Sequence, residues 1–245
     1  MCIRLVEVLI YWLEFVLGTM LSMSEIRDII DSYDSVIVRA YVTVRFYILR
    51  QRFLAEIGQY LPATGLIVDI GCGFGLFALF FALSEKGRVV HGFDLNDERI
   101  EMARAAAAKL GANNVQFQHG DARHLPPAQK FDAAYMLDIV HHIPPESVPT
   151  LINWVRQHLS PDGVFLIKDV ADRPWYKRLF TWGLDKLMDY RTPVHYWAPD
   201  QLMAQLRASG FSVHHHSMVD FLPYPHVLYI CRPTAGSTGS LRGGT

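Results

Sequence analysis

The chain of 245 residues is long enough for one sizeable domain with a small appended segment. Its 23 lysines and arginines nearly balance its 24 aspartates and glutamates, and this formal charge of −1 does not favour a nucleic-acid partner. The three cysteines form neither a disulfide framework nor a CxxC metal pattern, so we expect a reducing, cytoplasmic setting.

The N-terminal segment, residues 3–17, is strongly apolar. Glu7 and Glu14 interrupt it and no small-residue cleavage site follows, which argues against a signal peptide and against a spanning helix of roughly 20 apolar residues. Its polar residues recur at steps of three and four, so a helix here is apolar except for one narrow stripe. Such a helix is buried as a cap, buried in a homo-oligomer contact, or placed at a membrane interface. A natural start at Met20 or Met23 is a further alternative.

Residues 24–64 contain Tyr41, Arg45 and Arg52, which share one face if the segment is a single helix despite its β-branched residues. A surface helix with solvated arginines is the alternative. Together with the apolar N-terminus, this segment predicts an N-terminal helical cap over residues 1–64.

Strands and helices alternate from residue 65 onward, which predicts an α/β domain over 65–232 with a mostly parallel sheet and helices on both faces. The predicted strands are 66–70, 88–93, 115–118, 131–137 and 164–168, and the predicted helices are 74–84, 97–110, 145–159 and 199–209. Asn96 and Gly111 are the expected caps of the second helix, and 160–163 is an expected turn. The last two strands, at about 211–219 and 226–232, lack a helix between them and are expected to be antiparallel.

Residues 172–197 are inserted between the fifth strand and the last helix. Their central part, 174–190, combines a broad apolar surface with a mixed-charge stripe, which is typical of a lid over an apolar substrate or of a packed helix. Together with residues 3–21, this part would make peripheral contact with a membrane. The tail, residues 233–245, is of low complexity and is expected to be disordered.

The first polar cluster at a strand end combines Asp69 with three glycines, Gly71, Gly73 and Gly75. Glycines at this spacing let the backbone approach a ligand without obstruction by a Cβ atom and lead into a helix N-terminus. The acidic residue ahead of them favours a ligand with an ammonium group over a pyrophosphate. We therefore expect a ligand site at the carboxyl end of the first strand.

Two further carboxylates follow the next two strands. Asp94 is placed to accept both hydroxyls of a ribose, although an ordinary acid at a helix N-terminus is the alternative. After the third strand, Asp121 is placed to accept from an adenine amino group, with a backbone N–H of its neighbour Ala122 reaching the ring. Three such clusters, in order and at strand ends, favour a nucleoside-containing cofactor.

Five segments carry a resemblance to a known family: VDIGCGFG at 68–75, GFDLN at 92–96, GDAR at 120–123, FDAAYMLDIVHHIPPE at 131–146 and LSPDGVFLIKD at 159–169. With them, the chain resembles the class I S-adenosylmethionine-dependent methyltransferase superfamily. The resemblance implies a Rossmann-like, seven-stranded, mostly parallel sheet with an antiparallel last strand, and S-adenosylmethionine as the cofactor.

The resemblance also implies roles for individual residues. The glycine cluster with Asp69 would hold the methionine part of the cofactor, Asp94 and Leu95 the ribose, and Asp121 with Ala122 the adenine. Three residues would lie along the sulfonium, namely Met136, Leu137 and Asp138.

Methyl transfer needs a positioned nucleophile and, where the nucleophile must lose a proton, a base. His141 or His142 after the fourth strand would serve as the base, unless they only pack or cap locally. Lys168 and Asp169 end the fifth strand, where Lys168 is either catalytic or a solvated strand end and Asp169 orients a substrate hydroxyl or amine. Tyr41 is a further candidate, because N-terminal helices of this superfamily often close over the cofactor. No cluster has metal-ligand spacing.

The sequence thus predicts a methyltransferase acting on a small, hydrophobic or lipid-like molecule, with oxygen, nitrogen and carbon nucleophiles all open. An NAD-dependent oxidoreductase is one alternative, although it predicts GxGxxG and residue 76 is leucine. A catalytically silent scaffold subunit that retained the fold is the other.

Overall fold

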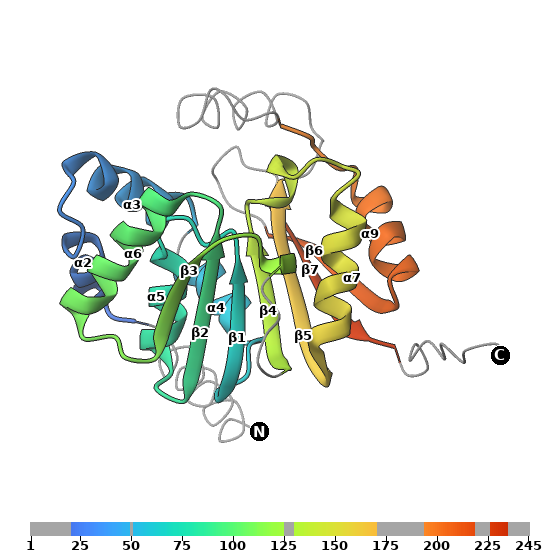
Figure 1. Ribbon diagram of the computed structural model, residues 1–245, viewed down its shortest axis with the longest axis horizontal. Helices are drawn as coiled ribbons and strands as arrows, with labels where there is room; N and C mark the ends of the chain where they lie inside the picture. Colours follow the sequence, from blue (N-terminus) through green and yellow to red (C-terminus); the bar gives the residue numbers. More distant parts are fainter. Residues whose placement is uncertain (1–20, 50, 125–129, 171–193, 219–225, 235–245) are drawn as a thin grey trace, which may run out of the picture. The chain divides into compact units, whose positions relative to one another are not determined.

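The computed structural model describes residues 21–49, 51–124, 130–170, 194–218 and 226–234 (Figure 1). The expectations for residues 3–20, for 174–190 and for the tail beyond residue 234 lie outside them. Seven strands form one sheet in the order β3-β2-β1-β4-β5-β7-β6, which confirms the predicted Rossmann-like α/β fold. The chain divides into two compact units, residues 1–137 and 138–245, and each is described by itself.

The first unit contains four parallel strands and the helices that precede and connect them. Its elements are α2 (Met23–Asp31), α3 (Val36–Ile48), α4 (Gln51–Gly58), β1 (Gly65–Ile70), α5 (Leu76–Ser84), β2 (Arg88–Asp94), α6 (Asp97–Leu110), β3 (Val115–His119), the short 3-10 helix η1 (Ala122–His124) and β4 (Phe131–Leu137). Figure 1 shows α6 lying along β3.

Helix α6 begins and ends where its sequence predicts. The Asn96 side chain accepts a hydrogen bond from the Arg99 backbone N–H at 2.9 Å, which satisfies a donor that the first turn leaves open. Gly111 ends the helix in the left-handed conformation, with φ of 61°. Helix α5, in contrast, begins two residues later than predicted, because Gly75 is its N-cap with φ of 78°.

The N-terminal helices do not form a single helix. The chain leaves helical geometry at Leu49, and α4 then packs with Phe53, Leu54 and Ile57 buried. Arg52 therefore lies in α4, and the expectation that it shares a face with Tyr41 and Arg45 is wrong.

The second unit contains the antiparallel part of the sheet. Its elements are the 3-10 helix η2 (Val140–His142), α7 (Val148–His158), β5 (Leu159–Val170), α9 (Pro199–Ala208), β6 (Phe211–Met218) and β7 (His226–Pro233). The predicted turn at 160–163 is wrong, since β5 already begins at Leu159. Strand β7 pairs antiparallel with both β5 and β6, so the last strand lies inside this part of the sheet and β6 is its edge.

Arg88, the first residue of β2, ties the N-terminal helices to the sheet. Its side chain is 4% exposed, and its guanidinium donates to the carbonyls of Gly58 (3.1 Å), Leu61 (3.4 Å), Pro62 (2.8 Å) and Phe81 (3.4 Å). A buried cation is stable only where such acceptors surround it. This one side chain therefore joins the end of α4 and the last turns of α5 to the start of β2.

We expect Arg88→Met to lower the free energy of unfolding by about 3 kcal/mol, because four backbone carbonyls, all buried or part-buried, lose a charged donor. Urea denaturation followed by far-UV circular dichroism measures the change. Lys86→Met, at an exposed position two residues away, is the matched control and should be nearly neutral. Equal effects of the two substitutions would contradict the anchoring role of Arg88.

Candidate active site

The loop from β1 into α5 needs glycine at three positions. Gly71, Gly73 and Gly75 have φ of 77°, 55° and 78°, which residues with a Cβ atom rarely adopt. At Gly75 a Cβ atom would also lie 2.4 Å from the Phe117 ring. At Gly73 nothing lies within 4 Å of the same position, so this side of the loop has room for a ligand.

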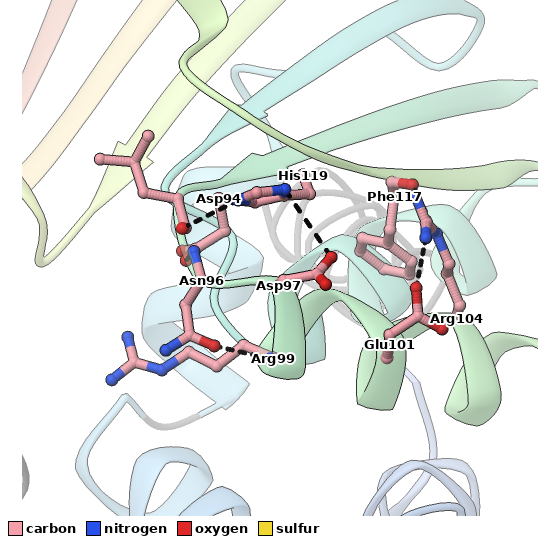
Figure 2. A network of polar contacts seen from close by, with 9 residues as sticks. Asp94, Asn96, Asp97, Arg99, Glu101, Arg104, Phe117 and His119 are labelled. Atoms are coloured by element: carbon pink, nitrogen blue, oxygen red, sulfur yellow. Dashed lines mark hydrogen bonds and ion pairs between the residues drawn. The ribbon is translucent and has the colours of Figure 1, made fainter.

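Asp94, at the end of β2, joins the glycine loop to the start of α6. One carboxylate oxygen accepts from the Gly73 backbone N–H at 2.8 Å. The other accepts from the N–H of Asn96 at 2.9 Å, and Figure 2 shows Asp94 beside Asn96. Asn96 is the residue that caps α6, so Asp94 supports the start of this helix and, through the Gly73 N–H, the glycine loop as well. Each carboxylate oxygen keeps a second lone pair, which fits the expected hydrogen bonds from ribose hydroxyls.

Asp69 is a buried carboxyl group whose Oδ2 atom has no hydrogen-bond partner among the described residues. Its pKa is raised to about 8, mainly by burial; the Tyr135 hydroxyl opposes the rise and the nearby Asp94 charge adds to it. A buried, unpaired acceptor costs free energy. An ammonium group at this position would remove that cost, which agrees with the expected methionine end of a cofactor.

The third predicted cluster contains a partner that the sequence reasoning missed. Asp121 accepts from the Arg123 backbone N–H at 2.9 Å and from its guanidinium Nη2 at 2.5 Å, while Ala122 is buried in η1. An adenine amino group at Asp121 would share this carboxylate with Arg123. The Asp-x-Arg spacing within GDAR was the available signal.

Leu95, the expected ribose neighbour, has a 72% exposed side chain, and its carbonyl accepts from His119 Nε2 at 3.1 Å. His119 also lies 3.7 Å from Asp97 in the first turn of α6 (Figure 2). The sequence reasoning did not select His119, because nothing local relates the end of β3 to residue 95. The contact shows that the ends of β2 and β3 are joined by side chains as well as by the sheet.

In the second unit, His141 and Asp169 form a buried pair. His141 Nδ1 bonds to Asp169 Oδ1, and the His141 backbone N–H donates to Asp169 Oδ2 at 3.1 Å. The His141 side chain is 2% exposed. Asp169 was expected to orient a substrate group, whereas the structure shows it orienting His141.

Lys168 and Asp138 form a second buried pair. The Lys168 ammonium bonds to the Asp138 carboxylate, and the Asp138 N–H donates to the Lys168 carbonyl at 2.8 Å. Lys168 is 0% exposed, so the expectation of a solvated strand end is wrong. Its pairing with a carboxylate does not favour Lys168 as a base. Asp138 has φ of 56°, a conformation that these two bonds hold in place.

The described end of the inserted segment contacts His141. The Tyr196 ring stacks on the imidazole with centroids 5.7 Å apart, and the His195 N–H donates to the His141 carbonyl at 2.6 Å. The His142 ring is also close to the His141 ring, with centroids 4.2 Å apart. Neither His195 nor Tyr196 stood out in the sequence.

Tyr41 and Arg45 both face α5 and the loop before it. The Tyr41 ring meets the Phe74 ring edge-on at 5.4 Å, and the Arg45 guanidinium lies 5.5 Å from the Phe77 ring centre. Arg45 is therefore not the solvated arginine of the alternative. Tyr41 lies beside the glycine loop, as expected for a residue that closes over a cofactor.

The described part of the chain contains neither a candidate metal site nor a candidate membrane-spanning helix. Three or more His, Cys, Asp or Glu side chains do not gather there in a way that would hold a metal ion. No helix within the same residues is long and apolar enough to cross a bilayer.

Comparison with known proteins gives the family. A family model described as "Methyltransferase domain" matches residues 41–216. An uncharacterized methyltransferase of Bacillus subtilis, YcgJ, is 35% identical over 104 residues, which is 42% of this chain and 40% of that protein. A ubiquinone biosynthesis O-methyltransferase of Dinoroseobacter shibae is 29% identical over 175 residues, which is 67% of this chain and 68% of the relative.

The fold is also that of solved methyltransferases. The magnesium protoporphyrin IX methyltransferase of Synechocystis PCC 6803, solved with bound SAH, has a TM-score of 0.58 and 19% identity, covering 74% of this chain and 82% of that one. The chain spans less than half the length of the first curated relatives it matches.

Because the family model covers more than half of the chain, the chain belongs to the methyltransferase-domain family. This confirms its resemblance to the class I S-adenosylmethionine-dependent methyltransferase superfamily. The family decides against the NAD-dependent oxidoreductase alternative.

The raised pKa of Asp69 makes the stability of the ligand-free protein depend on pH. The unfolded carboxyl ionises near its ordinary pKa of 3.8, whereas the folded one keeps its proton up to about pH 8. The folded state therefore binds the extra proton in this window, and stability falls as pH rises, by up to about 1.4 kcal/mol per pH unit.

We expect Asp69→Asn to remove this loss, so that the variant gains stability over the wild type between pH 5 and pH 8. Urea denaturation of both ligand-free proteins at several pH values measures the difference. Glu98→Gln, at an exposed position of α6, is the control and should leave the pH dependence as it is. Parallel curves for wild type and Asp69→Asn would show that Asp69 is already ionised in the folded state.

Proposed function

We propose that this methyltransferase methylates a hydroxyl group of a small, hydrophobic, lipid-like molecule, with His141 as general base. The observation that carries the proposal is the buried His141–Asp169 pair. A base of this kind is needed where the nucleophile must lose a proton, as a hydroxyl does. It has no use in methylation of a group that is already deprotonated.

The residues of the first unit fit S-adenosylmethionine. The unpaired Asp69 oxygen would accept from the ammonium group, Asp94 from the ribose hydroxyls, and Asp121 with Ala122 would hold the adenine. The open side of Gly73 leaves room for the methionine part. When bound, the cofactor supplies a methyl group made electrophilic by its sulfonium. Leu137 and Asp138 are the proposed neighbours of the sulfonium.

In the proposed step, the substrate oxygen bonds to the methyl carbon while the carbon–sulfur bond breaks and its electron pair stays on sulfur. His141 takes the hydroxyl proton. Because Asp169 engages Nδ1, the accepting atom is Nε2, and Asp169 stabilises the imidazolium that forms. His142 is the alternative base, since its side chain is less buried.

Two observations support a hydrophobic substrate. Tyr196 offers an aromatic surface next to His141. The relative from Dinoroseobacter shibae is named for ubiquinone biosynthesis and as an O-methyltransferase. A lid formed by residues 172–197, and membrane contact through residues 3–21 and 174–190, belong to the same proposal; most of these residues lie outside the described ones.

We expect His141→Gln to lower kcat by about 10²–10⁴-fold and to leave cofactor affinity unchanged, because only proton removal is lost. Asp169→Asn should lower kcat as well and change its pH profile. A radiolabelled methyl-transfer assay with a 4-alkylcatechol as the acceptor measures both.

His214→Gln, at an exposed position of β6, is the control and should keep full activity. Full activity of His141→Gln over the whole pH range would refute the base. A wild type that binds cofactor but methylates none of a panel of alkylated phenols, catechols and amines would instead support the silent scaffold.

We expect Asp94→Asn to weaken binding of S-adenosylhomocysteine by at least about tenfold, because an amide nitrogen replaces one acceptor for the ribose and for the loop. Isothermal titration calorimetry measures the affinity. Asp97→Asn removes an exposed carboxylate three residues further on and should bind normally. Equal affinities of the two variants would remove Asp94 from the ribose site.

A further inference from the structure

Phe74, which lies between Gly73 and Gly75 in the loop, is held from two helices. The Tyr41 ring of α3 meets its ring edge-on at 5.4 Å. The Arg99 guanidinium of α6 lies 5.6 Å from the ring centre, within the range of a cation–π contact. The side chain of Phe74 thus links α3 to α6 across the loop.

The backbone of Phe74 is held as well. Tyr33, between α2 and α3, donates a hydrogen bond from its hydroxyl to the Phe74 carbonyl at 2.8 Å. Tyr33 is 3% exposed, and burial raises the pKa of its hydroxyl, so the group stays protonated and remains a donor. Tyr33 lies 41 residues before Phe74, so this bond is a tertiary contact and not a local turn.

This loop needs an external restraint more than most loops do. Gly73 and Gly75 flank Phe74 in left-handed conformations, and glycine has more backbone states to lose than any other residue. If the free loop sampled those states, part of the binding free energy of a cofactor would be lost to ordering it. The contacts on Phe74 restrict the loop before any ligand arrives.

We propose that Tyr33 is a positioning residue for the cofactor: its hydroxyl bond to the Phe74 carbonyl, with the Tyr41 and Arg99 contacts on the ring, presets the glycine loop for S-adenosylmethionine. Through these contacts the N-terminal helices set the affinity for the cofactor, although Tyr33 itself does not touch the cofactor. The inference rests on the proposed function in one respect, that the glycine loop holds the cofactor.

The test compares Tyr33→Phe with the wild type and with Tyr47→Phe, in the full chain. Tyr33→Phe keeps the ring and removes the hydroxyl alone; Tyr47→Phe makes the same change at an exposed position of α3. We expect Tyr33→Phe to weaken binding of S-adenosylhomocysteine by about tenfold in calorimetry, and Tyr47→Phe to bind as the wild type does. With a methyl acceptor, KM for S-adenosylmethionine should rise with kcat nearly unchanged.

Hydrogen–deuterium exchange provides a readout that a purely structural role would not move. In ligand-free Tyr33→Phe, exchange should accelerate at residues 71–75 and not in β1 or α5, and saturation with S-adenosylhomocysteine should abolish the difference. Tyr41→Leu, which removes the ring contact, should weaken binding in the same direction.

The outcomes separate the inference from the proposed function. If the wild type binds S-adenosylhomocysteine and Tyr33→Phe binds it equally well, the positioning role is wrong, whatever the change in Tm. The same holds if exchange accelerates throughout the first unit, since the bond then only supports the fold. If Asp94→Asn and the wild type bind alike, the proposed cofactor site fails first.

Discussion

The left-handed turn of the glycine loop is the constraint on which the first unit depends. It lets the chain pass from β1 into α5 while the Gly73 N–H points to Asp94 and Gly75 fits against Phe117. Asp94 then reaches the start of α6 through Asn96. One backbone geometry therefore sets the relation between two strand ends and two helices, and a side chain at Gly75 would disturb all of them.

Buried ionisable side chains have two different roles in this protein. In the second unit, Lys168 with Asp138 and His141 with Asp169 are paired, and each pair holds a strand end in place. In the first unit, Asp69 is equally buried and has one oxygen without a partner among the described residues. Pairing lowers the free-energy cost of burying a charge. The unpaired oxygen of Asp69 is therefore the one at which we expect a ligand. The contrast is between polar groups that already have a partner and one that has an oxygen left for a ligand.

The N-terminal helices are linked to the sheet and to the glycine loop by a few side chains. Arg88 anchors α4 to β2, and Tyr33 and Tyr41 reach Phe74. These side chains link the N-terminal helices to β2 and to the glycine loop. In the proposed function, α2 and α3 act on the affinity for the cofactor, and the region around His141 and Tyr196 acts on the substrate.

The sequence by itself determined the alternation of strands and helices, the caps of α6 and the acidic residues at three strand ends. These features follow from short-range periodicity and from the chemistry of single residues, so local pattern is enough. Only the tertiary structure decided that β7 lies between β5 and β6, that Asp169 holds His141, that Lys168 is buried, and that Tyr33 holds the glycine loop. Each of these features joins residues that are far apart in the chain. Local sequence patterns do not determine which distant residue a side chain contacts in the packed core.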